Sequence, residues 1–261
     1  MVVMRSAKIH LALGRARRTS LLAWQGVNQI LWPPVCLCCG RDAGPDNSGL
    51  CSACWDQLLA CTAGEYCPRC GRDASRYGLV AGACPACQAT DVQFDGIARA
   101  GIYTETLRQI ILAFKHDRTE LEALLGSLAD AAFQGSSFYD EIDLVVPVPL
   151  HWTRRLVRGY NQSHRIAGRL NHPTVRIDTD LVRIRRTQAQ PVAATPAARE
   201  RNVKGAFAVR PDHRYAGRTV CLIDDIKTTG ATLNECAKTL KQAGAANVYA
   251  LVLAVAGQET G

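Results

Sequence analysis

A threonine-rich loop preceded by two acidic residues is the part of the sequence best suited to chemistry. Asp224 and Asp225 follow the apolar run 220–223 and precede a helix-like pattern. The loop between the acidic pair and this helix-like pattern consists of Lys227, Thr228, Thr229, Gly230, Ala231 and Thr232. Its small residues would let an anion approach the backbone amides, and a helix N-terminus favours negative charge. Because carboxylates repel phosphate and suit neutral hydroxyls, the segment predicts a ribose 5-phosphate site with the two acids on the sugar.

A second pattern is made of cysteines, which occur as two repeats of CxxC–linker–CxxC. The first repeat contains Cys36, Cys39, Cys51 and Cys54, and the second contains Cys67, Cys70, Cys84 and Cys87. A CxxC turn places two thiolates on one side of a tight knuckle, at the roughly 2.3 Å reach that Zn²⁺ needs. The spacing therefore predicts two closed, structural zinc ribbons, in which the metal supplies most of the folding free energy.

Other uses of these cysteines are less favoured. Disulfides need an oxidising compartment, a redox CxxC usually occurs once beside a βαβ unit, and an iron–sulfur cluster is a third alternative. Cys38 competes with Cys39 for the first knuckle, and Cys61 is surplus. Pairing of knuckles across the two repeats stays open.

The charge of the chain is uneven. The formal net charge is +8, yet residues 151–218 alone carry +11 and residues 36–95 carry −3. A uniform nucleic-acid-binding coat is therefore disfavoured, and a local anion site within 151–218 is favoured.

Beyond residue 89 the pattern becomes one of alternating strands and helices. This alternation predicts a parallel sheet with ligand sites at the carboxyl ends of its strands. Apolar runs predict strands over 142–146, 219–223 and 248–255. Helical periodicity fits 105–114, 120–133, 161–170 and 232–243.

The N-terminal segment is basic and has no acidic residue before position 36. Residues 20–32 predict a short amphipathic helix, with a mitochondrial-type presequence or a membrane-surface helix as the alternative. No stretch reaches about 18 apolar residues, so no transmembrane segment is expected and a cytoplasmic location is favoured. We expect three parts: the segment 1–35, a ribbon module 36–90 and a domain 95–261.

The segment 220–232 resembles the phosphoribosyl-diphosphate (PRPP) binding signature of type I phosphoribosyltransferases. Further matching segments are Ala113-Phe114-Lys115, Val146-Pro147-Val148-Pro149-Leu150-His151, the stretch from Arg154 to Gln162, 183–190 and 202–207. Together with the cysteine-rich region, they make the chain similar to the ComF (competence protein F) family. The resemblance covers nearly the whole chain after about residue 33.

This resemblance implies a type I phosphoribosyltransferase-like α/β fold, with a parallel sheet flanked by helices and preceded by a small double zinc-ribbon module. It implies that Asp224 and Asp225 are the catalytic pair, that 146–151 is a diphosphate loop and that 183–190 is a basic flap. The further substrate-binding residues that it implies are Pro147, Val148, Arg154, Arg158 and Arg185. Mg²⁺ would accompany the diphosphate. Lys227 departs from the family pattern, because that position is commonly uncharged or aromatic; a lysine there either binds phosphate or diphosphate or is solvated.

Three functions are compatible with these features. The family resemblance implies a role in DNA uptake, natural competence or DNA utilisation, with single-stranded DNA and DNA-uptake proteins as partners. The site itself suggests a catalytically active, PRPP-dependent phosphoribosyltransferase of nucleotide metabolism. The third alternative is a non-catalytic sensor of a phosphosugar whose ribbons dock a partner protein.

Overall fold

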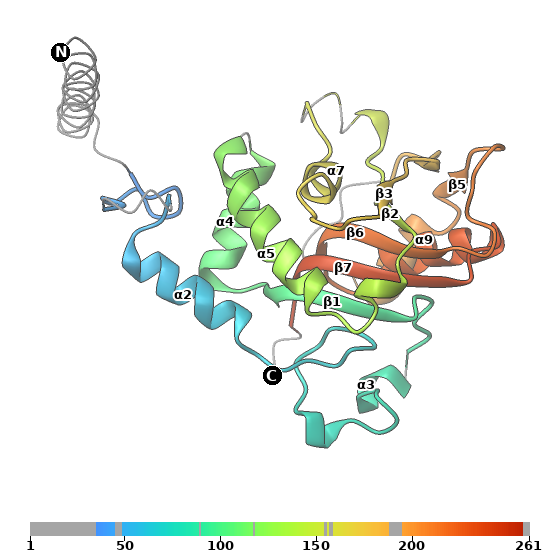
Figure 1. Ribbon diagram of the computed structural model, residues 1–261, viewed down its shortest axis with the longest axis horizontal. Helices are drawn as coiled ribbons and strands as arrows, with labels where there is room; N and C mark the ends of the chain where they lie inside the picture. Colours follow the sequence, from blue (N-terminus) through green and yellow to red (C-terminus); the bar gives the residue numbers. More distant parts are fainter. Residues whose placement is uncertain are drawn as a thin grey trace, which may run out of the picture. The chain divides into compact units, whose positions relative to one another are not determined.

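The computed structural model describes residues 35–44, 49–88, 90–116, 118–153, 156, 159–187 and 195–257 (Figure 1). The chain divides into two compact units, Met1–Trp55 and Asp56–Gly261, and each is described by itself. The helix predicted over 20–32 lies outside the described residues.

The described part of the first unit contains the first cysteine knuckle. Val35 and Asp42 form an isolated antiparallel bridge. Gly40 turns the chain at φ +74°, and its amide donates to the Cys36 carbonyl at 2.9 Å. A Cβ on Gly40 would meet no described atom within 4 Å. Helix α2 (Ser52–Thr62) begins in this unit.

A five-stranded parallel sheet forms the centre of the second unit, in the order β1-β7-β6-β2-β3 (Figure 1). The strands are β1 (Gly96–Ile102), β2 (Leu144–Pro147), β3 (Arg176–Ile177), β6 (Thr219–Lys227) and β7 (Asn247–Val255). Strand β7 is apolar after its first residue, and β6 is apolar from Val220 to Ile223, because elements cover both faces of the sheet. The parallel sheet expected from the sequence is thus confirmed.

Helices cover this sheet, and the second unit also contains a small two-stranded sheet. The helices are α3 (Pro85–Gln88), α4 (Glu105–Lys115), α5 (Glu122–Gln134), α7 (Gln162–Ala167), α8 (Pro196–Val203) and α9 (Ala231–Gln242). Three single 3₁₀ turns occupy Arg76–Gly78, Thr119–Leu121 and Tyr139–Glu141, and β4 (Leu181–Arg183) pairs with β5 (Phe207–Val209) in antiparallel fashion. Helix α5 packs on β1 and β7, α7 on β2 and β6, and α9 on β6 and β7. Val220 and Leu222 of β6 share one core cluster with Leu233 of α9, so the alternate residues of β6 face the other side.

Two element boundaries differ from the sequence prediction in ways that affect the site. Strand β6 continues to Lys227 instead of ending at residue 223, which places both acidic residues in the strand itself. Helix α7 begins after Asn161, whose side-chain oxygen accepts a hydrogen bond from the Ser163 amide at 3.1 Å. This cap fixes Ser163 at the first turn of the helix.

The second cysteine ribbon packs directly on the sheet. The Ile97 amide at the start of β1 donates to the Pro68 carbonyl at 2.8 Å. Gly71, at φ +77°, lies so close to the sheet that a Cβ there would be 3.0 Å from Val255 Cγ2 and 3.2 Å from Ile97 Cγ2. The ribbon therefore covers part of β1 and β7, on the face that also carries α9, because Ile97 and Val255 belong to the cluster of that helix.

Arg99 of β1 holds this ribbon in place. Its guanidinium donates to the Gly71 carbonyl at 2.8 Å, pairs with Asp73 and lies over the Tyr66 ring at 4.8 Å from the centroid. The Arg99 side chain is 2% exposed, whereas that of Asp73 is 61% exposed.

We expect Arg99→Leu to lower the free energy of unfolding by about 2–3 kcal/mol, because hydrogen bonds from a charged donor contribute about 1.5–3 kcal/mol. Urea unfolding measures the change, with Arg108→Leu on the exposed side of α4 as the control. Equal effects of the two substitutions would contradict this account.

Candidate functional site

The candidate site lies where the neighbouring strands β2 and β6 end. Residues Val145 and Pro147 of β2 pair with Cys221 and Ile223 of β6, and the Val148 amide continues the ladder to the Ile223 carbonyl at 2.9 Å. The chain then leaves β6 through the threonine loop and enters α9. Gly230 precedes that helix at φ +87°, a conformation that side chains disfavour. Parallel strands of this kind place ligand sites at their carboxyl ends.

The threonine loop surrounds a small niche of about 30 Å³. Its lining residues are Asp224, Ile226, Lys227, Thr228, Thr229, Gly230, Ala231, Thr232 and Leu233. The Ala231 amide donates to Thr229 Oγ1 at 3.3 Å, which closes the turn before α9. The structure thus brings together every loop residue that the sequence singled out.

The two carboxylates at the end of β6 have different partners. Asp225 forms an ion pair with Lys115 at the end of α4, with 2.8 Å between Oδ2 and Nζ. Asp224 Oδ1 accepts from Ser163 Oγ at 3.3 Å and from the Asp225 amide at 2.9 Å. Burial and the neighbouring Asp225 charge raise the pKa of Asp224 to about 7, although Lys115 and Ser163 act in the opposite direction.

This raised pKa predicts a pH-dependent stability. An unperturbed Asp has a pKa of 3.8. Between about pH 4 and 7, therefore, the folded protein retains a proton that the unfolded chain has lost. The free energy of unfolding should fall as the pH rises through this window, by roughly 1–3 kcal/mol in all.

Urea unfolding between pH 5.5 and 8 measures this fall. Asp224→Asn should remove it, so that the variant gains stability relative to wild type as the pH rises. A constant difference between the two proteins across this range would disprove the assignment.

Lys115 and Ser163 are site residues whose roles the sequence did not predict. The Ala113-Phe114-Lys115 motif belongs to the family resemblance, but nothing local shows that its lysine meets Asp225, 110 positions along the chain. Ser163 directly follows the 158–162 motif, and only the packing of α7 on β6 brings it to Asp224.

The segment 146–151, predicted as a diphosphate loop, begins in the last two residues of β2 and continues beyond the strand. Pro147 lines a cavity of about 540 Å³ that also contacts Trp152, Tyr160 and Arg210. Val148 is buried, its amide is bonded to Ile223, and its carbonyl accepts from Asn161 Nδ2 at 3.1 Å. Pro147 therefore faces the cavity, whereas Val148 supports the loop.

The predicted arginines are not all placed at these strand ends. Arg185 is exposed and donates to the carbonyls of Asn202 at 3.0 Å and Lys204 at 2.6 Å, so it binds the end of α8 and lines neither cavity. Arg154, Arg158 and residues 188–190 of the predicted flap lie outside the described residues.

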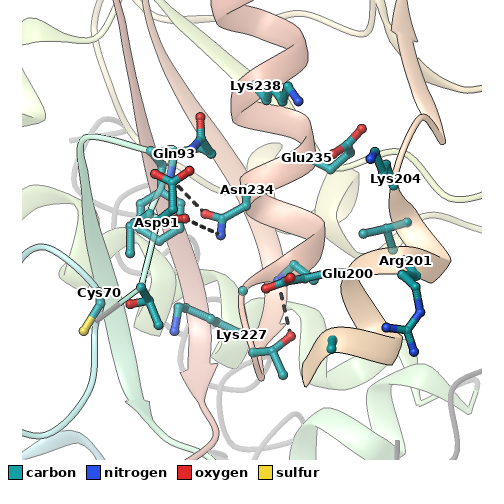
Figure 2. Close-up of a pocket in the computed structure, with 18 of the residues that line it drawn as sticks. Cys70, Asp91, Gln93, Glu200, Arg201, Lys204, Lys227, Asn234, Glu235 and Lys238 are labelled. Carbon is teal, nitrogen blue, oxygen red and sulfur yellow. Dashed lines mark hydrogen bonds between the residues drawn. The ribbon is translucent and has the colours of Figure 1, made fainter. Parts of the chain in front are cut away.

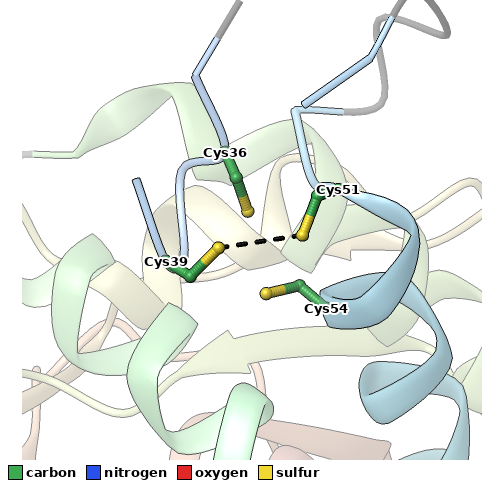
Figure 3. A group of neighbouring side chains, drawn as sticks. All are labelled: Cys36, Cys39, Cys51 and Cys54. Atoms are coloured by element: carbon green, nitrogen blue, oxygen red, sulfur yellow. Dashed lines mark hydrogen bonds between the residues drawn. The ribbon is translucent and has the colours of Figure 1, made fainter. Parts of the chain in front are cut away.

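The eight predicted metal ligands form two separate tetrads, one from each repeat, and Figure 3 shows the first. The Sγ–Sγ distance is 3.7 Å for Cys39–Cys51, and 3.6 Å for Cys70–Cys84 in the second tetrad. Four thiolates at the Zn–S distance of about 2.3 Å lie about 3.8 Å apart in a tetrahedron, so the donor set fits Zn²⁺. All twelve cysteines are free of disulfides.

This geometry also shows which cysteines lie outside the two tetrads. Cys39, and not Cys38, completes the first tetrad, and neither tetrad mixes the two repeats. Cys61 is buried with its Sγ 3.6 Å from the Thr104 carbonyl. Cys221 and Cys236 are buried in the core around the sheet.

Comparison with known families agrees with this architecture. The model of the double zinc ribbon domain matches residues 27–88, and that of the phosphoribosyl transferase domain matches residues 156–261. The parallel sheet, the loop after β6 and the two tetrads therefore define a phosphoribosyltransferase-type protein with a double zinc ribbon, and the tetrads are structural zinc sites.

Whole-chain relatives identify the family. The chain is 30% identical over 228 residues to Competence protein F of Haemophilus influenzae, covering 84% of this chain and 96% of the relative. It thus belongs to the ComF (competence protein F) family. It is also 28% identical to the DNA utilization protein YhgH of Escherichia coli K12 (83% and 94% covered) and 29% identical to Competence protein ComFC of Bacillus subtilis (80% and 85%).

Solved structures are more distant. The allosteric regulatory enzyme of purine biosynthesis overlaps 51% of this chain and 26% of its own, at 20% identity and a TM-score of 0.34. Among the described helices, none has the length and apolarity to cross a membrane.

Proposed function

We propose that the site at the ends of β2 and β6 binds phosphoribosyl diphosphate or a related phosphosugar. The observation that carries this proposal is the convergence of the acidic pair, the threonine loop and the segment after β2 on two adjacent strand ends. The sheet thus places groups suited to sugar hydroxyls beside groups suited to phosphate.

In this proposal each part of the site binds a different part of the ligand. The hydroxyls of Thr228, Thr229 and Thr232 and the start of α9 bind the 5-phosphate. Asp224 and Asp225 bind the ribose hydroxyls, and the Lys115 ammonium pairs with Asp225. Because the pKa of Asp224 is about 7, its carboxyl can donate or accept a hydrogen bond near neutral pH.

The diphosphate and its metal would lie toward the segment 147–151. Arg154 and Arg158 are proposed to neutralise the diphosphate, as arginine does by bidentate hydrogen bonds. Mg²⁺ would accompany the diphosphate and would supply stabilisation of the charge on that leaving group.

Isothermal titration with PRPP and Mg²⁺ tests the proposal. Thr228→Val removes one phosphate hydrogen bond and should weaken binding about tenfold, since such bonds contribute about 1.5–3 kcal/mol. Thr239→Val, further along α9, is the matched control and should bind as wild type does. Absence of heat with the wild-type protein, or equal weakening by both variants, would refute the proposal.

Turnover separates the enzyme from the sensor. A phosphoribosyltransferase releases diphosphate when an acceptor attacks the anomeric carbon of PRPP. A phosphosugar sensor binds PRPP but releases no diphosphate. Diphosphate release measured with each common nucleobase in turn distinguishes these two uses of the same site.

For the biological role, we infer that the protein acts in DNA uptake or DNA utilisation in the cytoplasm, with single-stranded DNA and DNA-uptake proteins as partners. The names of the relatives and the +11 charge of residues 151–218 support this inference. Binding to single-stranded DNA should weaken steeply as salt increases, because each neutralised phosphate releases counterions. Binding that is absent, or that does not respond to salt, would rule out direct DNA contact.

A further inference from the structure

A larger cavity lies on the ribbon side of the threonine loop, and Figure 2 shows it. We call it the ribbon-side pocket. Its volume of about 580 Å³ is within the range of about 300–1,000 Å³ that is common for small-molecule sites. Cys70 and Arg72 of the second ribbon, the segment 90–94, α8 and α9 form its walls. Lys227, Thr229, Gly230 and Ala231 line both this pocket and the niche, whereas Asp224, Thr228 and Thr232 line only the niche.

The walls of this pocket are fixed by hydrogen bonds. Asn234 Nδ2 donates to the Asp91 carbonyl at 3.2 Å, and Asn234 Oδ1 accepts from the Gln93 amide at 3.1 Å. On the opposite wall, Glu235 Oε1 accepts from the Gly205 amide at 2.6 Å. The shape of the pocket is therefore built into the fold before any ligand binds.

Cationic side chains outnumber acidic ones in the pocket. The basic residues are Arg72, Arg201, Lys204, Lys227 and Lys238, and the acidic residues are Asp91, Glu200 and Glu235. Within the described part of the chain, none of the five basic residues forms an ion pair. The pocket thus offers an excess of positive charge that protein carboxylates do not neutralise.

Lys227 is the most constrained of these cations. It is 4% exposed, and Figure 2 shows its side chain extending from the end of β6 toward the Cys70 side of the pocket. Its Nζ would lie 3.8 Å from a Cβ on Gly230. No hydrogen-bond partner of its ammonium occurs among the described residues. Because most of this side chain is removed from water and its ammonium lines the pocket without such a partner, an anion beside it would be favoured.

We propose that the ribbon-side pocket binds a second, phosphorylated small molecule whose phosphate pairs with Lys227. The second zinc ribbon is then a wall of a ligand site in addition to a structural element. The alternative partner for the Lys227 ammonium is the zinc–thiolate cluster that contains Cys70, which carries two negative charges. The experiment below decides whether Lys227 pairs with a bound phosphate or with this cluster. The proposal does not require PRPP to occupy the niche.

The test uses crystals of the zinc-loaded full chain soaked in increasing concentrations of tungstate, a heavy analogue of phosphate located by its anomalous scattering. We expect one tungstate beside Lys227 in the ribbon-side pocket and another in the niche. Lys227→Met should raise the concentration that half-fills the pocket at least about tenfold, and it should also weaken the niche because Lys227 lines both. Lys238→Glu, at a residue that lines only the pocket, should weaken the pocket and leave the niche unchanged, and this variant serves also if Lys227→Met does not fold. Arg108→Glu is the charge-matched control and should change neither site.

The outcomes separate the two proposals. Tungstate in the niche but not in the pocket overturns this inference and leaves the PRPP proposal standing. Tungstate in the pocket but not in the niche supports this inference and counts only against the PRPP proposal. Tungstate held solely between neighbouring molecules of the crystal is an adventitious ion only, and it overturns the inference. If Lys227→Met loses the second zinc ion and tungstate does not enter the wild-type pocket, Lys227 pairs only with the cysteine thiolates. In that case the inference is wrong.

Discussion

Cys84→Ser should release one of the two zinc ions and unfold the second ribbon. Cys84 is buried, its Sγ lies 3.6 Å from that of Cys70 and 3.7 Å from that of Cys87, and its amide donates to Cys67 Sγ at 3.3 Å. Structural zinc contributes an apparent binding free energy of about 10–16 kcal/mol in small ribbons. Apart from its cysteines, the ribbon cluster contains only Ala74, Leu79 and Ala86 among the described apolar residues. Little else would therefore keep the ribbon folded.

The loss should spread into the sheet because the ribbon covers it. Without the knuckle, Ile97 and Val255 become accessible to water and Arg99 loses the Gly71 carbonyl. We expect the free energy of unfolding to fall by at least about 3 kcal/mol and the melting temperature by about 10 °C. Zinc content per chain and calorimetry measure both effects, and Cys38→Ser, outside the tetrads, should keep both ions. Two zinc ions in Cys84→Ser would show that the assigned tetrad is wrong.

Asp225→Asn should weaken the binding of PRPP by about 10- to 100-fold. The substitution removes a charged acceptor for a ribose hydroxyl, worth about 1.5–3 kcal/mol. It also leaves the Lys115 ammonium, whose side chain is 16% exposed, without its carboxylate. Removing the neighbouring negative charge should in addition lower the pKa of Asp224, because that charge helps to raise it.

Isothermal titration with PRPP and Mg²⁺ measures this loss, and Asp212→Asn on the exposed surface is the matched control. Lys115→Met should weaken binding less, since it leaves both carboxylates in place. Wild-type affinity in Asp225→Asn would exclude Asp225 from the sugar site, even if other loop variants lose binding.

The parts of the site that could be predicted from sequence are local ones. The segment 219–242 contains a strand, a loop and a helix in direct succession, so its composition alone indicates all three. The CxxC knuckles are equally local, because two thiolates and a sharp turn occur within four residues.

The rest depends on contacts between distant parts of the chain. Strand β1 has the sequence Gly-Ile-Ala-Arg-Ala-Gly-Ile, and its two glycines and central arginine do not predict a buried strand. The strand can be buried because Arg99 binds the second ribbon. The ion pair of Lys115 with Asp225 likewise requires α4 to end beside β6. The wall that Cys70 and Arg72 give to the ribbon-side pocket follows only from the packing of the ribbon on β1 and β7.

The knuckle glycines show that the two cysteine repeats are not equally free to diverge. Gly40 and Gly71 occupy the same place in each repeat and have nearly the same φ, +74° and +77°. At position 40 only the backbone conformation disfavours a side chain, so asparagine or aspartate can be accepted there at modest cost. At position 71 the sheet also fills the space that a Cβ would need. Mutational drift can therefore alter the first knuckle, whereas the second accepts a new residue only if Val255 or Ile97 changes with it.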